Sequence, residues 1–142
     1  MFNKATITFL SISQNEAFAR NAVASFMLPL NPTLSVLSDV KTAVSEAVTN
    51  AIVHGYPDSV GDIELTIILS DGKLHIEIKD YGVGIESVDD ALEPFYTTKA
   101  ENERSGMGFT VMKSFMDEFS VSSRLNEGTT VTLIKYVNEN NA

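Results

Sequence analysis

The sequence contains no cysteine. Disulfide bonds, thiolate metal sites and cysteine nucleophiles are therefore excluded, and the absence is typical of a protein from a reducing compartment. Positive charge is also scarce, because 10 lysines and arginines stand against 19 aspartates and glutamates, which leaves a net charge of −9. A surface so negative repels a phosphate backbone, so we expect no direct contact with nucleic acid and a protein partner with a basic face instead.

Long apolar runs are missing as well. None approaches the roughly 20 residues that a membrane-spanning helix requires, and the N-terminus lacks the basic flank and apolar stretch of a secretory signal. We therefore expect no membrane association, no secretion and a cytoplasmic location. The chain does have 44% hydrophobic and 20% charged residues over 142 positions, which suits one folded domain spanning residues 1–142.

Hydrophobic periodicity changes between strand and helix patterns along the chain. Period-two alternation predicts strands, and apolar residues three and four apart predict helices. The expected order is a strand (5–12), two helices (13–30 and 37–54), two strands (63–69 and 74–79), a third helix (109–119) and a closing hairpin (119–125 and 129–137). Helices in groups beside consecutive hairpins predict an α+β fold, a two-layer α/β sandwich whose mixed, mostly antiparallel sheet carries helices on one face.

Local signals mark the ends of some of these elements. Ser13 and Glu16 have the spacing of a capping box, which predicts that the first helix opens at Ser13. The pair Asp71-Gly72 lies between two predicted strands and is a hairpin signal. From Asp80 to Met107 the periodicity breaks down, and so long a loop inside a compact domain is typical of a functional lid or a disordered segment.

Three polar side chains follow one another at intervals of four on the second predicted helix. Glu46, Asn50 and His54 therefore share one stripe of the helix surface. A carboxylate, an amide oxygen and an imidazole on one stripe can converge on a pocket. The oxygen ligands suit Mg²⁺, which binds one or two protein oxygens together with phosphates and waters. The alternative is an ordinary solvated helix face.

An acidic residue followed by spaced glycines stands where a predicted strand ends. In the run Asp80 to Gly84, Gly82 and Gly84 allow the backbone close to a ligand, and the Asp80 carboxylate can accept a hydrogen bond, for example from an exocyclic amine. The alternative is a tight turn without a ligand. The dinucleotide fingerprint does not fit, because the next three residues supply no third glycine.

Small residues lead into the third predicted helix. Their backbone N–H groups lie at the positive end of the helix dipole, an arrangement that favours phosphate. Lys99 and Arg104 lie on the same loop and can add charged hydrogen bonds to phosphate oxygens, and Thr130, after the last predicted turn, can bring one more hydroxyl. The alternative is a glycine-rich helix entry and a plain hairpin turn. The small-residue run is Arg104-Ser105-Gly106-Met107-Gly108-Phe109.

Other common chemistries lack their motifs. The chain has neither a Gly-x-x-x-x-Gly-Lys-Ser/Thr P-loop nor a His-Arg-Asp catalytic loop, so neither common kinase architecture fits. A Gly-x-Ser-x-Gly elbow is also missing, which speaks against an α/β-hydrolase. The two histidines, His54 and His75, are too few for a histidine-rich metal site.

Together, in this order and spacing, the three clusters resemble the N, G1 and G2 boxes of the GHKL ATPase superfamily. Within it, the whole chain is similar to the small anti-sigma factors that act as serine kinases, and most of all to those of endospore-forming bacteria. The stretches that carry this similarity are Val44 to Ile52, Phe95 to Lys99 and Glu103 to Phe109. The resemblance implies a Bergerat-type nucleotide pocket in a fold that covers nearly the full length.

The resemblance also implies roles for individual residues. Glu46 would be the catalytic base, and Arg104 would stabilise charge on the phosphoryl group. Asn50 would hold Mg²⁺, Asp80 would receive the adenine amine, and the long loop would be the lid. The residues expected to bind ATP or ADP are Asn50, His54, Asp80, Gly82, Gly84, Thr98, Lys99, Ser105, Gly106, Met107, Gly108, Phe109 and Thr130.

Partners follow from the same resemblance. Members of this family keep a sigma factor, of the sporulation sigma-F type in the members most similar to this chain, away from RNA polymerase. They also phosphorylate an anti-anti-sigma protein on serine, and they act as dimers, so a homodimer is expected. Arg20 matches the arginine with which the family contacts its protein partners. Three alternatives stay open: an anti-sigma-B-type stress-response kinase, a nucleotide-gated binding module with little kinase activity, and the ATPase domain of a histidine kinase.

Overall fold

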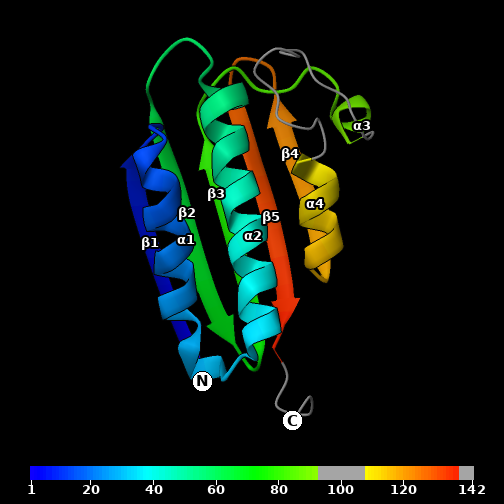
Figure 1. Ribbon diagram of the computed structural model, residues 1–142. Coiled ribbons are helices and arrows are strands. Elements are labelled where there is room, and N and C mark those ends of the chain that lie inside the picture. The colour runs from blue at the N-terminus through cyan, green and yellow to red at the C-terminus, as the bar shows by residue number, and fades with distance from the viewer. Residues whose placement is uncertain (93–107, 138–142) are drawn as a thin grey trace.

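The computed structural model describes residues 1–92 and 108–137. Five strands form one sheet in the order β1-β2-β3-β5-β4, and α1, α2 and α4 lie on the same face of it (Figure 1). The strands are β1 (Phe2–Leu10), β2 (Asp62–Ser70), β3 (Lys73–Asp80), β4 (Glu118–Arg124) and β5 (Gly128–Tyr136). The α-helices are α1 (Gln14–Phe26), α2 (Leu34–Asn50), α3 (Val88–Ala91) and α4 (Gly108–Phe115). A 3₁₀ turn (Leu28–Leu30) follows α1, and a π-helix (Ala51–Gly55) continues α2.

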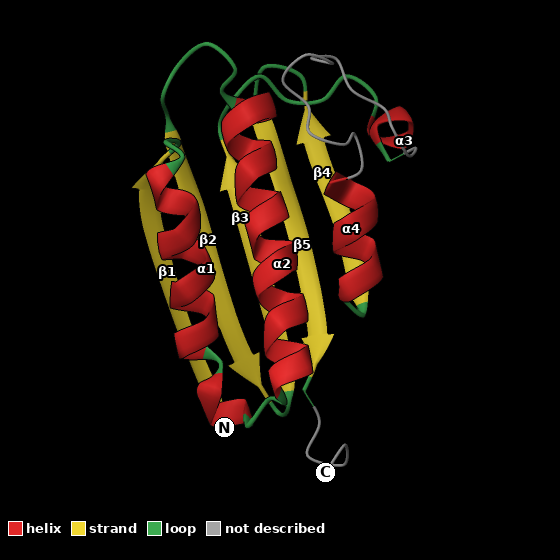
Figure 2. Cartoon of the chain, viewed as in Figure 1, coloured by secondary structure: helices red, strands yellow, loops and turns green. Residues whose placement is uncertain are grey.

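The predicted fold class, a two-layer α+β sandwich with helices on one face, is confirmed. Figure 2 shows a layer of helices in front of a layer of strands. The sequence allowed for a mixed sheet, and all four strand pairs that the described residues form are antiparallel. Such a sheet needs only one buried face, which agrees with the alternation that predicted its strands.

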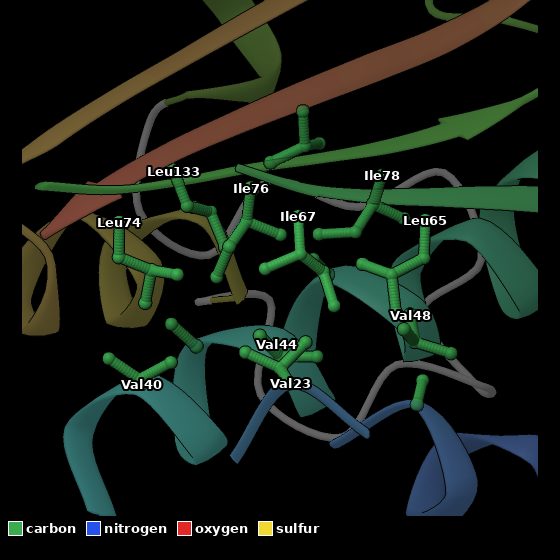
Figure 3. Close-up of a cluster of buried hydrophobic side chains, with 14 of the residues drawn as sticks. Val23, Val40, Val44, Val48, Leu65, Ile67, Leu74, Ile76, Ile78 and Leu133 are labelled. Atoms are coloured by element: carbon green, nitrogen blue, oxygen red, sulfur yellow. The ribbon is translucent and has the colours of Figure 1, made fainter. Parts of the chain in front are cut away.

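The hydrophobic core lies between the two layers. Every second side chain of β2 and β3 is buried beneath the helices, and the side chains between them lie half-buried or exposed on the face turned away, called the open face below. Figure 3 shows how side chains from α1, α2, β2, β3 and β5 meet there. The core residues labelled in it are Val23, Val40, Val44, Val48, Leu65, Ile67, Leu74, Ile76, Ile78 and Leu133.

Helix α2 crosses the centre of this core. It begins at an N-cap, where the Thr33 hydroxyl accepts a hydrogen bond from the Val36 N–H at 3.1 Å. Its apolar stripe packs on the sheet, and its C-terminal end lies at the same end of the molecule as the end of β3 (Figure 1). α2 is the longest of the described helices with 17 residues, and no helix in the described ranges is long and apolar enough to cross a membrane.

The predicted hairpin turn between β2 and β3 is confirmed. Asp71 and Gly72 have φ angles of 51° and 78°, the left-handed conformation that a tight two-residue hairpin requires. The turn fixes the register of the two strands, which pairs Ser70 with Lys73 at one end and Ile63 with Asp80 at the other. A local turn signal thereby places Asp80 at the far end of the sheet.

The predicted capping box is wrong. Ser13 has helical backbone angles (φ −61°, ψ −28°) and makes no side-chain cap hydrogen bond. Glu16 instead accepts a hydrogen bond from the Ser45 hydroxyl of α2 and pairs with Arg20, whose Nε lies 3.2 Å from its Oε2. The Glu16 side chain therefore contacts α2 instead of capping the start of α1.

Some element ends also differ from the prediction. β1 begins and ends earlier than expected, α3 falls inside the segment predicted to lack structure, and α4 ends at Phe115. Phe119 belongs to β4 rather than to α4, and its ring lies 5.7 Å from that of Phe109. Phe119 follows the apolar residues of α4 at helical spacing, but it packs against the hydrophobic core from β4.

Two adjacent isoleucines of β2 test which face of the sheet carries the stability. Ile67 is 1% exposed beneath the helices, whereas Ile68 lies on the open face. Ile67→Ala should lower the free energy of unfolding by about 2–5 kcal/mol, the usual cost of a core cavity, and the matched control Ile68→Ala by only about 1 kcal/mol. Urea unfolding measures both, and equal losses would contradict the layer assignment.

Candidate functional site

The first polar cluster lies where α2 turns into the π-helix. The Tyr56 N–H donates to the Ala51 carbonyl at 3.2 Å, a bond across five residues. Such insertions are frequent at functional sites. Asn50 and His54 both line a cavity at this end of the sheet, as their shared stripe predicted.

Asp80, the last residue of β3, is the only buried carboxylate among the described residues and is 4% exposed. The Gly82 N–H donates to Asp80 Oδ1 at 2.9 Å, and the Thr129 N–H donates to the same carboxylate. Burial raises the pKa of Asp80 above its ordinary value of 3.8, while these two N–H groups, which favour the charged form, lower it in part.

The end of α2 and the end of β3 touch without intervening side chains. The Val83 N–H donates to the Gly55 carbonyl at 2.8 Å. A Cβ atom on Gly82 would lie 1.8 Å from that carbonyl oxygen, and a Cβ atom on Gly55 would lie 2.8 Å from the Asp80 carboxyl carbon. Both positions therefore require glycine, and their packing brings Asp80 next to the stripe of α2. We call this contact the α2–β3 junction.

A cavity of about 250 Å³ opens beside the α2–β3 junction. Its floor is apolar, formed by Ile78, Ala47 and Val131, and Asp80 is the buried charge in its wall. Gly84, with φ +75°, lines one side and Gly108 and Phe109 at the start of α4 line another. A largely apolar cavity with a buried carboxylate among a few polar lining residues suits a flat ligand that carries a hydrogen-bond donor.

Glu46 lies at the edge of this site and is not part of the cavity wall. A Cβ atom on Gly108 would lie 3.4 Å from Glu46 Oε1 and 3.7 Å from the Asn50 side-chain amide, so both side chains face the start of α4. Glu46 also lines a second groove between α1 and α2, together with Arg20 and Lys41. One side of Glu46 thus meets the start of α4, and the other meets the groove that contains Arg20.

The structure brings together part of the predicted nucleotide site. Asn50, His54, Asp80, Gly84, Gly108 and Phe109 line the cavity, and Gly82 supports Asp80 from behind. The predicted residues Thr98, Lys99, Arg104, Ser105, Gly106 and Met107 lie outside the described residues. In the described ranges no group of three or more His, Cys, Asp or Glu side chains could hold a metal ion by itself.

Two adjacent threonines at the start of β5 differ in their position relative to the cavity. Thr129 lines the cavity and Thr130 does not, because consecutive side chains of β5 point to opposite faces of the sheet. The Thr129 hydroxyl lies 2.8 Å from the Ser123 hydroxyl, which also accepts the Ile85 N–H at 2.8 Å. The alternation of the inward residues Val131 and Leu133 could have identified Thr129, and the alternation of Phe119 and Val121 in β4 could have identified Ser123.

The family described as histidine kinase-like ATPase domain matches this chain over residues 13–135. The match includes every described residue that lines the cavity, from Ala47 to Val131. The chain therefore belongs to the histidine kinase-like ATPase domain family.

Similar full-length proteins within this family share one name. An anti-sigma F factor of Anoxybacillus flavithermus is 51% identical over 143 residues, which cover 100% of this chain and 98% of the relative. An anti-sigma F factor of Thermoanaerobacter sp. (strain X514) is 50% identical over 135 residues, 95% of this chain and 94% of the relative. That of Bacillus thuringiensis (strain Al Hakam) is 48% identical over 143 residues, with 100% and 98% covered. The similarity to small anti-sigma factors that the three motifs predict is confirmed.

The fold also has a solved counterpart. The crystal structure of the RsbU and RsbW domains of Rv1364c from Mycobacterium tuberculosis matches with a TM-score of 0.65 and 18% identity, covering 94% of this chain and 32% of that chain. At this identity the match concerns the fold alone. It agrees with the arrangement of one antiparallel sheet and one helix layer described above.

The raised pKa of Asp80 gives the stability a specific pH dependence. Folding raises this pKa, so the stabilisation from the protonated carboxyl is complete below about pH 3.8 and is lost as the pH rises through the folded-state value. Asn cannot titrate. The unfolding free energy of the wild type, relative to Asp80→Asn, should therefore fall as the pH rises from the acid range, and it should level off above the folded-state pKa.

Urea unfolding between about pH 4 and pH 8 measures this difference. Asp58→Asn, at an exposed carboxylate, is the matched control, because it leaves Asp80 in place and should keep the pH dependence that Asp80 causes. A wild type that gains stability relative to Asp80→Asn as the pH rises would contradict the assignment of Asp80 as a carboxylate destabilised by burial.

Proposed function

We propose that the chain is an ATP-dependent protein serine kinase that also binds and inhibits a sigma factor of the sigma-F type. The observation that carries this proposal is the position of Glu46. Its carboxylate lies beside Gly108 at the start of α4, one helical turn from Asn50. A carboxylate base is thus next to a helix start that suits phosphate and next to an amide that suits Mg²⁺.

The residues present fit an adenine nucleotide. Asp80 offers a buried acceptor among largely apolar lining residues, and an exocyclic amine could donate a further hydrogen bond to its carboxylate. Thr129 adds a hydroxyl on the same wall, and Asn50 adds an amide oxygen toward the start of α4. The adenine would lie against Asp80 and Thr129, and the phosphates would extend toward Asn50 and Gly108.

In the proposed reaction, Glu46 Oε1 removes the proton from the hydroxyl of the substrate serine. Bound ATP and Mg²⁺ supply the phosphoryl group and the stabilisation of its charge. Asn50 would hold the metal through its amide oxygen, and Asp80 would orient the adenine ring of the bound nucleotide. We further propose that His54, Thr98, Lys99 and the run Ser105 to Phe109 bind the nucleotide, and that Arg104 stabilises the transferred group.

The names of the full-length relatives support the choice of partners. Those proteins are called anti-sigma F factors, which supports a sigma-F-type factor as the inhibited partner and an anti-anti-sigma protein as the serine substrate. Arg20 is the proposed contact for both, because it lies in the groove that Glu46 also lines. A homodimer located in the cytoplasm completes the proposal. An anti-sigma-B-type kinase would use the same cavity with other partners.

One observation favours a second candidate, a nucleotide-gated binding module with little phosphoryl transfer. Glu46 is not among the cavity-lining residues and faces the groove that contains Arg20 and Lys41. If the Glu46 carboxylate only contacts a partner protein, bound ATP would control the binding of that partner without transferring its phosphoryl group. The two candidates differ in whether the Glu46 carboxylate is needed for transfer.

Radiolabelled ATP, Mg²⁺ and a candidate anti-anti-sigma protein distinguish the two candidates. The wild type should transfer label to serine, and Glu46→Gln should reduce the transfer rate by about 10²–10⁴-fold, the usual contribution of a general base. ATP affinity should change little, because the glutamine keeps the shape. Glu64→Gln, a matched change on β2 outside the site, should transfer at the wild-type rate.

Serine labelling by Glu46→Gln at the wild-type rate would rule out Glu46 as the base. Tight ATP binding by the wild type without any labelling would favour the nucleotide-gated module over the kinase.

A further inference from the structure

Tyr56 lies next to the α2–β3 junction and outside the cavity-lining set. Its hydroxyl accepts the Tyr81 N–H at 2.8 Å and donates to the Asp62 carbonyl at 2.7 Å. One side chain therefore ties the residue after β3 to the first residue of β2. Burial raises the pKa of Tyr56 above its ordinary value of 10.0, so the hydroxyl keeps the proton that it donates to Asp62.

The backbone that Tyr56 holds is the backbone that orients Asp80. Tyr81 stands between Asp80 and Gly82, and the Gly82 N–H donates to Asp80 Oδ1 at 2.9 Å. The Tyr56 backbone also closes the π-helix through its bond to the Ala51 carbonyl. Tyr56 thus forms hydrogen bonds on two sides. Its backbone N–H bonds to the carbonyl of Ala51, the residue after Asn50, and its hydroxyl bonds to the N–H of Tyr81, the residue after Asp80.

We propose that Tyr56 is a positioning residue for base recognition: its hydroxyl fixes the Tyr81 backbone so that Asp80 presents its carboxylate to an exocyclic amine. This inference rests on the proposed function. Tyr56 does not contact the ligand and acts only through Asp80. Loss of the hydroxyl should therefore lower the preference for ATP over GTP, and it should have a smaller effect on the free energy of unfolding.

Tyr56→Phe removes both hydrogen bonds and keeps the ring. Calorimetric titration of the whole chain with Mg²⁺ and either ATP or GTP should show an ATP affinity lowered about five- to ten-fold, the usual value of one or two neutral hydrogen bonds. GTP affinity should change less than two-fold, so the preference for ATP falls. A merely structural loss would lower both affinities together, because it would act through the folded fraction.

Tyr136→Phe is the matched control, because it also removes a bonded tyrosine hydroxyl, one that contacts Glu118 away from the cavity. It should bind both nucleotides like the wild type. Gly61→Ala is an independent second variant, because a Cβ atom there would lie 2.3 Å from the Tyr56 ring and displace it with its hydroxyl intact. It should reproduce the loss of ATP preference.

The outcomes separate the two proposals. Absence of ATP binding by the wild type would overturn the proposed function. Wild-type ATP binding together with an unchanged ATP preference in Tyr56→Phe would overturn the role of the Tyr56 hydroxyl alone, whatever Gly61→Ala does. A lower ATP preference in Tyr56→Phe, with Tyr136→Phe unchanged, supports that role, and Gly61→Ala should reproduce it.

Discussion

The close contact between the end of α2 and the end of β3 determines the rest of the site. The hydrogen bond from Val83 to the Gly55 carbonyl, and the absence of side chains at Gly55 and Gly82, bring the backbone of the π-helix that continues α2 against the backbone of the loop that follows β3. Any larger residue would separate the two layers at this point. The contact buries the Asp80 carboxylate and places it beside the polar stripe of α2. The folded state accepts a carboxylate whose pKa is raised by burial, and such a cost is typical of functional sites.

Helix α2 takes part in two surfaces at once. Its C-terminal half provides Asn50 to the cavity, while Glu46 faces both the start of α4 and the groove beside α1. The residue before Glu46, Ser45, donates a hydrogen bond to Glu16, and Glu16 pairs with Arg20. Under the proposed function, the nucleotide and the protein partner therefore contact one rigid helix from two sides. A substitution at Glu46 can be expected to influence both surfaces.

Much of the fold and part of the site were predictable because their signals are local. Alternation in β2 and β3, the left-handed turn at Asp71-Gly72 and the four-residue spacing of the α2 stripe each depend on near neighbours in the chain. The failures involve distant partners. The Glu16 side chain, expected to bond within the capping box, bonds Ser45, 29 residues away, and Tyr56 bonds Tyr81, 25 residues away. Thr129 lines the cavity and Thr130 does not, because the inward alternation of β5 extends to its first residues.

Under the proposed function, Asp80 binds the adenine base and Asn50 binds the metal. Calorimetric titration with ATP, with and without Mg²⁺, tests this division most directly in the wild type, Asp80→Asn and Asn50→Ala. We expect Asp80→Asn to weaken ATP binding by about ten-fold or more in both conditions, the value of a hydrogen bond to a charged group. Asn50→Ala should remove only the part that depends on Mg²⁺. Wild-type ATP affinity in both variants, with and without Mg²⁺, would contradict the account.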